Sequence, residues 1–352
     1  MLKRWGVLWI ALACCSLMTA AQQSTTDHPA ARTPAATISF DVLVTDPSGN
    51  PVTGLQEKDF TVLDNGSPAP IQSFAAYDSS TAGPPESVIV LIDDVNTDSV
   101  DLMYAWKQIG EFLTMHGGHL PAPVSLLLLT DSNLKRLAGP SQDGALLKSE
   151  MGKMPGMIQA LPQGDRNNAA DRMEISLKAL MVLGAIEARK PGRKLVIWIG
   201  PGWWMFDNGS VLEWNEQQKS IFQTIMVTSQ VLRAVHITID SVDPLGSDKA
   251  DAMHTYLWKS HLKPVTKWQE AKPADLALQV LAAQSGGRMV WGSNNVAEEL
   301  DACLEDARAW YTVTVPVPSD AALNSWQGVE VNVDRPGAKV RTQNGYYAVP
   351  AK

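Results

Sequence analysis

The chain has 352 residues, and its 37 acidic side chains outnumber the 29 basic ones to give a formal net charge of −8. An acidic chain without a basic run is poorly suited to nucleic acid or to an anionic membrane surface, so we expect neither as a partner. The length exceeds that of a usual single domain, which favours two domains.

The first residues have the layout of a secretory signal peptide. Lys3 and Arg4 precede the apolar run WGVLWIALACCSLM, and small residues follow before Gln22. A basic start, a short apolar stretch and small residues at the cleavage point are the features of such a signal, and the run is short for a membrane span. We predict a signal peptide over residues 1–21 and export to the periplasm or the cell exterior, with no membrane insertion of the mature chain.

Removal of this segment changes the composition of the mature chain. Two basic residues leave with it, so 27 basic side chains remain against 37 acidic ones and the net charge becomes −10. Residues 22–36, rich in Ala, Thr, Ser, Gln and Pro, are expected to form a disordered lead-in. Cys303 stays as the single thiol, so no internal disulfide can form. The alternative to cleavage after Ala21 is a lipid anchor at Cys14 or Cys15.

Both ends of the mature chain show the alternation of short antiparallel strands. Apolar residues alternate with polar ones from Ile38 to Val44, and the same alternation returns near the end in VEVNV. Turn sequences such as DPSGNP and DNGS separate these runs. Roughly 40 residues of strand at either end are too few to bury a good core alone. We predict that residues 37–80 and 309–352 dock together as one discontinuous β-sandwich.

The middle of the chain, residues 86–308, alternates strands and helices. Its strands are continuous apolar runs, VIVLID, VSLLLLT, KLVIWIG, VHITID and RMVW. Amphipathic patterns lie between them, as where Leu102, Trp106 and Ile109 share one stripe. Such alternation is typical of a parallel sheet covered on both faces. We predict an α/β fold with a doubly wound, mostly parallel sheet inserted into the β-sandwich; the segment 245–272 fits neither pattern.

Five motifs, taken in chain order, resemble a known family. They read VLVTDPSGNPVTGLQEKDFTVLDNG, VIVLIDDVNT, GRKLVIWIGPG, LAAQSGGR and VNVDRPGAKVRTQNGYYA. They are similar to the VWFA-related proteins of the acidobacterial type, which are secreted bacterial relatives of the von Willebrand factor type A domain. The resemblance implies a type A domain of Rossmann-like topology carried on a β-sandwich. It also implies a protein-binding module, often with a metal held at the top of the sheet.

Acidic side chains come at the ends of three predicted strands. Asp93 and Asp94 follow VIVLI, Asp131 follows VSLLLLT, and Asp240 closes VHITID. Ligands of open α/β sheets bind beyond the carboxyl ends of the strands, so these acids are expected to line one rim. Oxygen ligands that converge from loops suit Mg²⁺ or Ca²⁺ rather than zinc.

The type A resemblance implies a metal motif: Asp-x-Ser-x-Ser after the first strand, a Thr in a later loop and an Asp after the fourth strand. Here a valine stands where the middle Ser would be, and the place of the last Asp falls in GPGWW, which holds no carboxylate. The candidate ligands are Asp93, Asp94, Asn96 and Thr97. Two interpretations stay open. One is a weak Mg²⁺ or Ca²⁺ site; the other is a helix N-cap at Asn96, Thr97 or Asp98 with no required cofactor, which the missing elements favour.

A run of large apolar residues directly follows KLVIWIG. Trp203, Trp204 and Met205 lie on a Gly/Pro turn and cannot all point inward. Aromatic side chains give large contact areas and are enriched in binding hot spots. We expect these residues to contact a partner at the rim; the alternative is a lid that packs on the neighbouring helix.

No catalytic signature occurs in the sequence, which lacks the G-x-S-x-G elbow, the G-x-x-x-x-G-K-[ST] phosphate loop, G-x-G-x-x-G and H-E-x-x-H. We therefore expect a non-enzymatic, exported module for protein binding or adhesion that uses the rim and takes another protein as its partner. The alternative is a structural subunit of a cell-envelope assembly that makes its contacts through edge strands of the β-sandwich. A cation-dependent hydrolase is a less favoured third hypothesis.

Overall fold

The computed structural model describes residues 36–78, 87–153, 169–203, 214–244, 258–318 and 320–348. The predicted signal peptide lies outside these residues, as do Trp204 and Met205. Within the described part of the chain, no helix has both the length and the apolar character needed to cross a bilayer.

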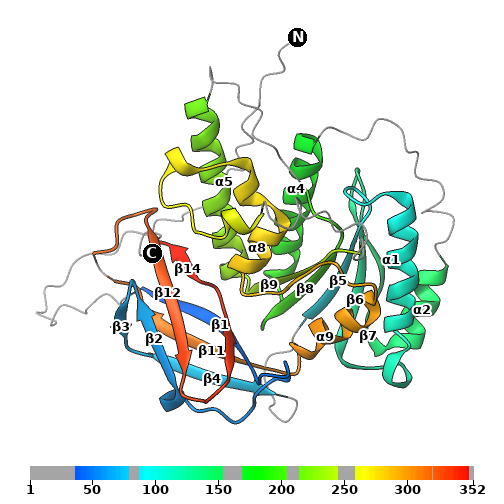
Figure 1. Ribbon diagram of the computed structural model, residues 1–352, viewed down its shortest axis with the longest axis horizontal. Coiled ribbons are helices and arrows are strands. Elements are labelled where there is room, and N and C mark those ends of the chain that lie inside the picture. The colour runs from blue at the N-terminus through cyan, green and yellow to red at the C-terminus, as the bar shows by residue number, and fades with distance from the viewer. Residues whose placement is uncertain are drawn as a thin grey trace, which may run out of the picture. The chain divides into compact units, whose positions relative to one another are not determined.

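Six strands of the described residues form one sheet in the order β10-β9-β8-β5-β6-β7 (Figure 1). They are β5 (Ser87–Asp93), β6 (His119–Leu129), β7 (Leu134–Asp143), β8 (Lys194–Ile199), β9 (Ile237–Val242) and β10 (Met289–Val290). Neighbours run parallel, except that β6 and β7 form an antiparallel pair. Counted along the chain, this is the 3-2-1-4-5-6 order of the Rossmann fold. The predicted α/β class with a mostly parallel sheet is therefore confirmed, whereas the antiparallel edge strand β7 was not predicted, because LKRLAGPSQD carries little apolar pattern.

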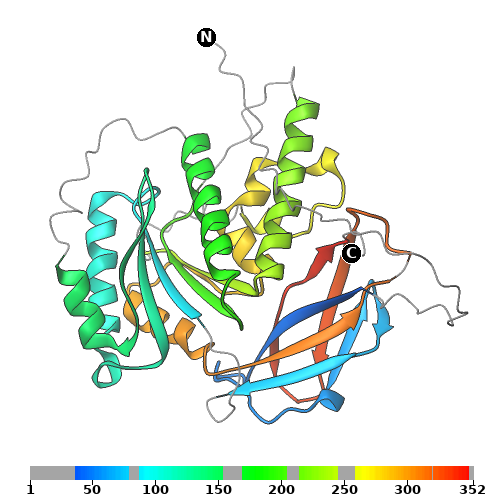
Figure 2. The same ribbon diagram turned by 180° about the vertical axis from the view of Figure 1, so that it is seen from behind.

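Helices cover both faces of this sheet (Figures 1 and 2). One face carries α1 (Ser99–Phe112), α2 (Gly144–Gly152) and α9 (Val296–Glu305), and the other carries α4 (Ala169–Glu187), α5 (Trp214–Ala234) and α8 (Leu278–Gln284). Successive residues of a strand point to opposite faces, so Val90 joins the first core and Leu91 the second. Cover on both faces explains the continuous apolar run of β5. Short 3₁₀ turns are η1 (Glu57–Asp59), η2 (Met115–Gly118), η4 (Trp258–His261), η5 (Trp268–Glu270) and η6 (Pro273–Leu276).

Strands from the two ends of the chain pair with each other. One sheet has the order β13-β1-β11-β4 and a second has β14-β12-β2-β3 (Figure 2). Their bounds are β1 (Thr37–Thr45), β2 (Phe60–Asp64), β3 (Ser67–Ala69), β4 (Ser73–Asp78), β11 (Ala309–Pro316), β12 (Trp326–Val333), β13 (Lys339–Arg341) and β14 (Gly345–Tyr347). Both sheets contribute to one core, in which the ring centroids of Phe60 and Tyr311 lie 5.1 Å apart. The division of the chain into an inserted domain, 86–308, and a β-sandwich remains a prediction.

A buried carboxylate joins the tail strands to the α/β sheet. Asp306, directly after α9, is fully buried and lies 2.9 Å from Nε and 2.7 Å from Nη2 of Arg288. Its carboxylate oxygens also lie 2.6 Å from Nη2 of Arg341 in β13, and its backbone oxygen accepts a hydrogen bond from Arg193. Three arginines from distant parts of the sequence therefore converge on one residue, which fixes β13 against the end of α9.

Candidate functional site

The turn after β5 is organised by the side chain of Asp93. Its Oδ1 accepts hydrogen bonds from the backbone N–H groups of Val95 and Asn96, both at 3.0 Å. Its Oδ2 accepts from Nδ2 of Asn96 at 2.8 Å and from the indole Nε1 of Trp198 in β8 at 2.9 Å. An ionised carboxylate offers about four lone-pair positions, and here all four are used by donors of the protein.

Two opposing effects act on this carboxylate. Complete burial raises the pKa of Asp93, while the hydrogen bonds from Trp198 and Asn96 act to lower it, and burial is the larger effect. A buried carboxylate without these donors would carry a large desolvation cost. The side chain is therefore built into the fold of the turn rather than directed at solvent.

Asp98 caps the helix that follows. Its Oδ1 accepts hydrogen bonds from the backbone N–H groups of Val100 and Asp101, each at 2.9 Å, at the start of α1. The predicted helix N-cap is therefore confirmed at Asp98. Of the other candidates in this turn, Thr97 is buried and Asp94 is partly buried.

These residues do not fit a site for a hard cation. The carboxylate of Asp93 already accepts hydrogen bonds from protein donors on both oxygens, and Oδ1 of Asn96 is buried without a hydrogen bond from a described residue. A Cβ atom on Gly200 would lie 2.9 Å from the Cβ of Asp93, so the exit of β8 has no room for an acidic side chain. Within the described part of the chain, no group of three or more His, Cys, Asp and Glu side chains is placed to hold a metal. Mg²⁺ and Ca²⁺ prefer several oxygens, usually from more than one carboxylate.

Titration with Mg²⁺ or Ca²⁺ is expected to give no saturable binding below about 1 mM, because a cation would have to displace the donors that already hold Asp93. Isothermal titration of the wild-type protein measures this directly. Asp93→Ala should instead lower the free energy of unfolding by roughly 1–3 kcal/mol, since the indole of Trp198 and two backbone N–H groups would lose their acceptor. Sub-millimolar binding that disappears in Asp93→Ala would contradict this account.

The other two acids that were predicted at the rim, Asp131 and Asp240, lie in different environments. Asp131 lies in the exposed turn between β6 and β7, where it accepts a hydrogen bond from Ser132 at 2.9 Å. Asp240 is not at the rim, because β9 continues beyond it to Val242. Its carboxylate is fully buried and accepts a hydrogen bond from the backbone N–H of Arg288 at 2.7 Å. The prediction that Asp240 lines the rim is therefore wrong.

Trp203 is a core residue. Only 2% of it is exposed, its Nε1 donates a 2.8 Å hydrogen bond to the backbone oxygen of Leu276, and its ring centroid lies 5.5 Å from that of Trp198. Its burial leaves no indole surface for a partner, so the predicted partner contact at Trp203 is replaced by packing in the core. Trp204 and Met205 lie outside the described residues, and their contact with a partner remains a prediction.

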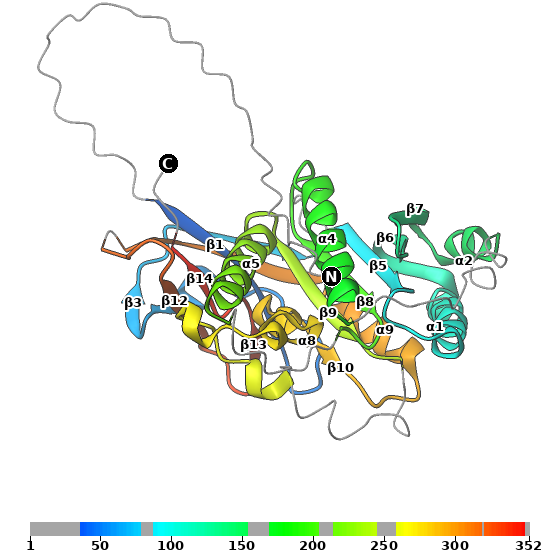
Figure 3. The same ribbon diagram turned by 90° about the horizontal axis from the view of Figure 1, so that it is seen from above.

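A different set of apolar side chains is exposed where strands of the sheet end. Val100 and Met103, on the first turns of α1, are 71% and 57% exposed, and Trp291, directly after β10, is 38% exposed. The hydroxyl of Tyr104 donates a 2.9 Å hydrogen bond to the backbone oxygen of Asn294, which ties these two segments together. Figures 1 and 3 show α1 beside α9, the helix that follows Trp291. We call Val100, Met103, Tyr104, Trp291 and Asn294 the rim surface.

The indole of Trp291 is held in place by its neighbours. Its ring centroid lies 5.3 Å from that of Trp258 in an edge-to-face arrangement, and Nζ of Lys259 lies 5.0 Å from it. Sequence reasoning missed Trp291, because RMVW reads as one strand. A signal for Val100 and Met103 was present, since both lie off the stripe that contains Leu102.

Comparison with known proteins gives no family assignment. No family model matches the chain, and no curated protein sequence matches it. Solved structures to which it is similar include the human COPII-coat protein Sec24c, at 7% identity and a TM-score of 0.34 over 78% of this chain and 46% of that one. A manganese-loaded TRAP protein of Plasmodium vivax aligns at 9% identity with a TM-score of 0.34, over 77% of this chain and 96% of that one. The pilus adhesin SpaC of Lactobacillus rhamnosus GG aligns at 7% identity with a TM-score of 0.34, over 85% of this chain and 49% of that one.

The chain therefore spans about half the length of the Sec24c and SpaC chains that it matches. TM-scores of this size carry no conclusion about function. The class of the protein rests on its own strand order, which defines an α/β chain with a mostly parallel, Rossmann-like sheet.

Proposed function

We propose that this chain is an exported protein-binding module whose partner docks on the rim surface. The observation that carries the proposal is the exposure of Val100, Met103 and Trp291 beside the carboxyl ends of the strands. Ligands of open α/β sheets bind in this region. Tryptophan and methionine are enriched in protein interfaces.

The proposal also includes the sequence predictions about fold class, domain division and export. We place the sheet and its helices in the von Willebrand factor type A class and treat residues 86–308 as a domain inserted into a β-sandwich of 37–80 and 309–352. Support comes from the strand order and from the core that the two chain ends share. Export is part of the proposal because of the predicted signal peptide. Binding needs no cation, since Asp93 is held by protein donors.

Replacing Val100 and Met103 together by Ser is expected to reduce partner capture at least about tenfold, which corresponds to about 1.4 kcal/mol of binding free energy. The measurement is affinity capture from cell-envelope extract, with the proteins enriched by the wild type identified by mass spectrometry and quantified for each variant. Both side chains are exposed on a helix, so the melting temperature should stay within a few degrees of the wild type.

A matched control is the double variant Val182→Ser and Ile186→Ser. These side chains are also exposed on a helix, at 50% and 44%, but they lie on α4 rather than on the rim surface. The control should capture the same proteins as the wild type. Equal losses in both double variants, or full capture by the rim variant, would rule out the rim surface as the docking site.

The second candidate function is a structural subunit of a cell-envelope assembly. The observation that favours it is β4, an edge strand that pairs only with β11 among the described strands. An exposed edge can add a strand from another chain. Capture that survives the rim substitutions and is lost when Ala76 of β4 is replaced by Pro would favour this function over the first.

A further inference from the structure

The segment 258–272, which includes the turns η4 and η5, is a basic stretch in an acidic chain. In the chain as a whole, acidic side chains outnumber basic ones by 37 to 29. This segment holds one acid, Glu270, and four exposed lysines, Lys259, Lys263, Lys267 and Lys272. Figure 1 draws it in yellow beside α5 and α8. Positive charge is therefore concentrated in one exposed stretch of a molecule whose net charge is −8.

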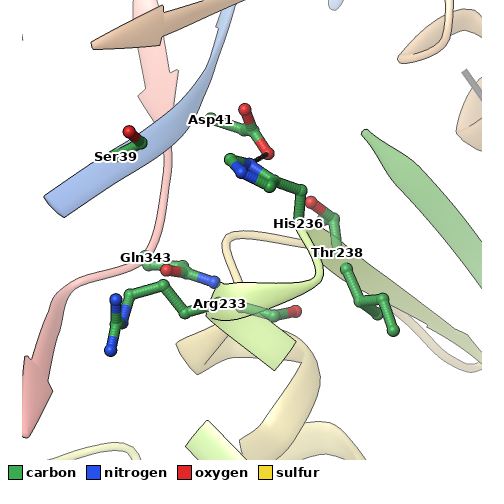
Figure 4. A pocket seen from close by; sticks show the side chains of 8 residues that line it. Ser39, Asp41, Arg233, His236, Thr238 and Gln343 are labelled. Carbon is green, nitrogen blue, oxygen red and sulfur yellow. Dashed lines mark hydrogen bonds and ion pairs between the residues drawn. The ribbon is translucent and has the colours of Figure 1, made fainter. Parts of the chain in front are cut away.

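These four lysines form no ion pair with a carboxylate in the described part of the chain. Basic groups elsewhere do face an acid, as where Nδ1 of His236 lies 2.9 Å from Oδ2 of Asp41 (Figure 4). The acid that follows the segment, Asp275, is engaged by His261 at 2.6 Å. The ammonium groups of the segment can therefore pair with carboxylates of another molecule.

Lys259 is the member of this set that lies at the rim surface. Its Nζ is 5.0 Å from the ring centroid of Trp291 and 5.7 Å from that of Trp258. Contact with two aromatic rings favours one position for an ammonium group on a flexible stem. Asp243, whose backbone N–H donates to the backbone oxygen of Val290, forms no ion pair with Lys259. The rim surface therefore carries a positive charge beside its exposed indole.

The α1 side of the rim surface carries the opposite charge. Asp98 is exposed at the start of α1, two positions before Val100. The hydrogen bond from Tyr104 to Asn294 connects this side to the segment that contains Trp291. The surface thus has an acidic side, exposed apolar side chains and a basic side, and such a distribution of charge can orient a partner.

We propose that the rim surface binds a protein that docks through an acidic segment, which places a carboxylate at Lys259 and apolar side chains on Val100 and Met103. This inference rests on the proposed function and specifies the chemistry of its partner. Opposite charges across an interface steer association and suppress wrong partners.

The exposed apolar side chains beside the lysine favour a protein over other polyanions, because protein interfaces combine apolar contacts with charged ones. An anionic bilayer is an extended surface, so it would also meet the net negative charge of the rest of the molecule. A short acidic segment experiences mainly the charges within a Debye length, about 10 Å at 0.1 M salt. The local positive charge therefore suits a short acidic segment of a protein.

The test is fluorescence anisotropy of a labelled peptide in which Glu residues flank a Leu-Phe pair, titrated with the exported protein. Matched peptides carry Gln or Lys in place of Glu. The Glu peptide should bind saturably, the Gln peptide more weakly and the Lys peptide not at all. Lys259→Glu should raise the Kd of the Glu peptide about fivefold, because an attractive pair becomes a repulsive one.

Two control variants separate charge from packing. Lys259→Arg keeps the positive charge beside the indoles and should bind the Glu peptide like the wild type. Lys58→Glu makes the same charge reversal at an exposed lysine of η1, outside the segment, and should also bind like the wild type. No binding of the Glu peptide to the wild type, or an equal Kd in the wild type and Lys259→Glu, would overturn the proposal. Tighter binding of heparin or of phosphatidylglycerol vesicles than of the Glu peptide would also overturn it.

Capture from cell-envelope extract distinguishes failure of this inference from failure of the proposed function. If the variant with Ser at positions 100 and 103 loses its captured proteins while Lys259→Glu keeps them, the rim surface is the docking site and the acidic partner is ruled out. If the Ser variant keeps them, the proposed function itself fails. Loss of the same proteins in both variants, together with the Lys259-dependent binding of the Glu peptide, is the expected result.

Discussion

Replacing Asp306 by Ala is expected to lower the free energy of unfolding by about 3–5 kcal/mol, the cost of removing one partner from a buried ion pair. Asp306 is fully buried and accepts hydrogen bonds from both Arg288 and Arg341. These arginines hold the pKa of Asp306 below its usual value, although burial alone would raise it. Without the carboxylate, the two guanidinium groups would lose the acceptor of these hydrogen bonds.

Denaturation of Asp306→Ala by guanidinium chloride, followed by tryptophan fluorescence, measures this loss. Glu305→Ala is the matched control, because Glu305 is the adjacent carboxylate and pairs with an exposed Arg308. Exposed ion pairs contribute about 0–1 kcal/mol, so the control should stay close to the wild type. Similar losses of unfolding free energy in the two variants would show that Asp306 contributes no more to stability than an exposed ion pair does.

The sheet could be predicted from the sequence because a strand that is buried on both faces has apolar residues at successive positions. VIVLID is apolar at successive positions, which is the pattern of a strand between two layers of helices, and β5 spans Ser87–Asp93. The strand β7 has no such pattern, because it is an edge strand and six of its 10 residues are polar or exposed. The head and tail strands alternate because each covers one face of a shared core.

The site was harder to predict because its contacts are set by register and packing. Asp93 was expected at the exit of β5, and it is there. Its hydrogen bond from Trp198, however, depends on the parallel register that sets Leu91 opposite Trp198. Nothing in KLVIWIG shows that one indole N–H meets a carboxylate of another strand. In the same way, Trp203 is buried by a contact with Leu276, which is 73 positions away in the sequence.

The exposure of apolar residues was predicted from their grouping along the sequence. This rule was less reliable than the apolar pattern that predicted the buried strands. The run around Trp203 suggested a binding surface, but the side chain lies in the core. Val100, Met103 and Trp291 stand apart in the sequence and are exposed. Which apolar side chain remains outside depends on the helix face that packs inward, and a single off-stripe residue gives little sequence signal.

Stability is expected to fall as the pH rises from about 4 to 6, because Asp240 binds a proton more tightly in the folded chain. Burial, followed by the charge of Asp306, raises the pKa of Asp240 from 3.8 to about 6. The groups that face it are Arg288, Cys303, Asp306 and Arg341. Between these two pKa values the unfolded chain has released the proton and the folded chain retains it. Each pH unit in this window then costs about 1.4 kcal/mol, on the order of 3 kcal/mol in all.

Comparison of the wild type with Asp240→Asn separates this effect from other titrations. The amide does not titrate, so the stability of the variant relative to the wild type should rise by on the order of 3 kcal/mol between pH 4 and pH 8. His236 shifts stability in the same direction, since its pKa is also raised and its contribution is lost as the pH rises through that value. It is present in both proteins and cancels in the difference. Urea denaturation at a series of pH values gives that difference, and a constant value from pH 4 to 8 would mean that the pKa of Asp240 is the same in the folded and unfolded chains.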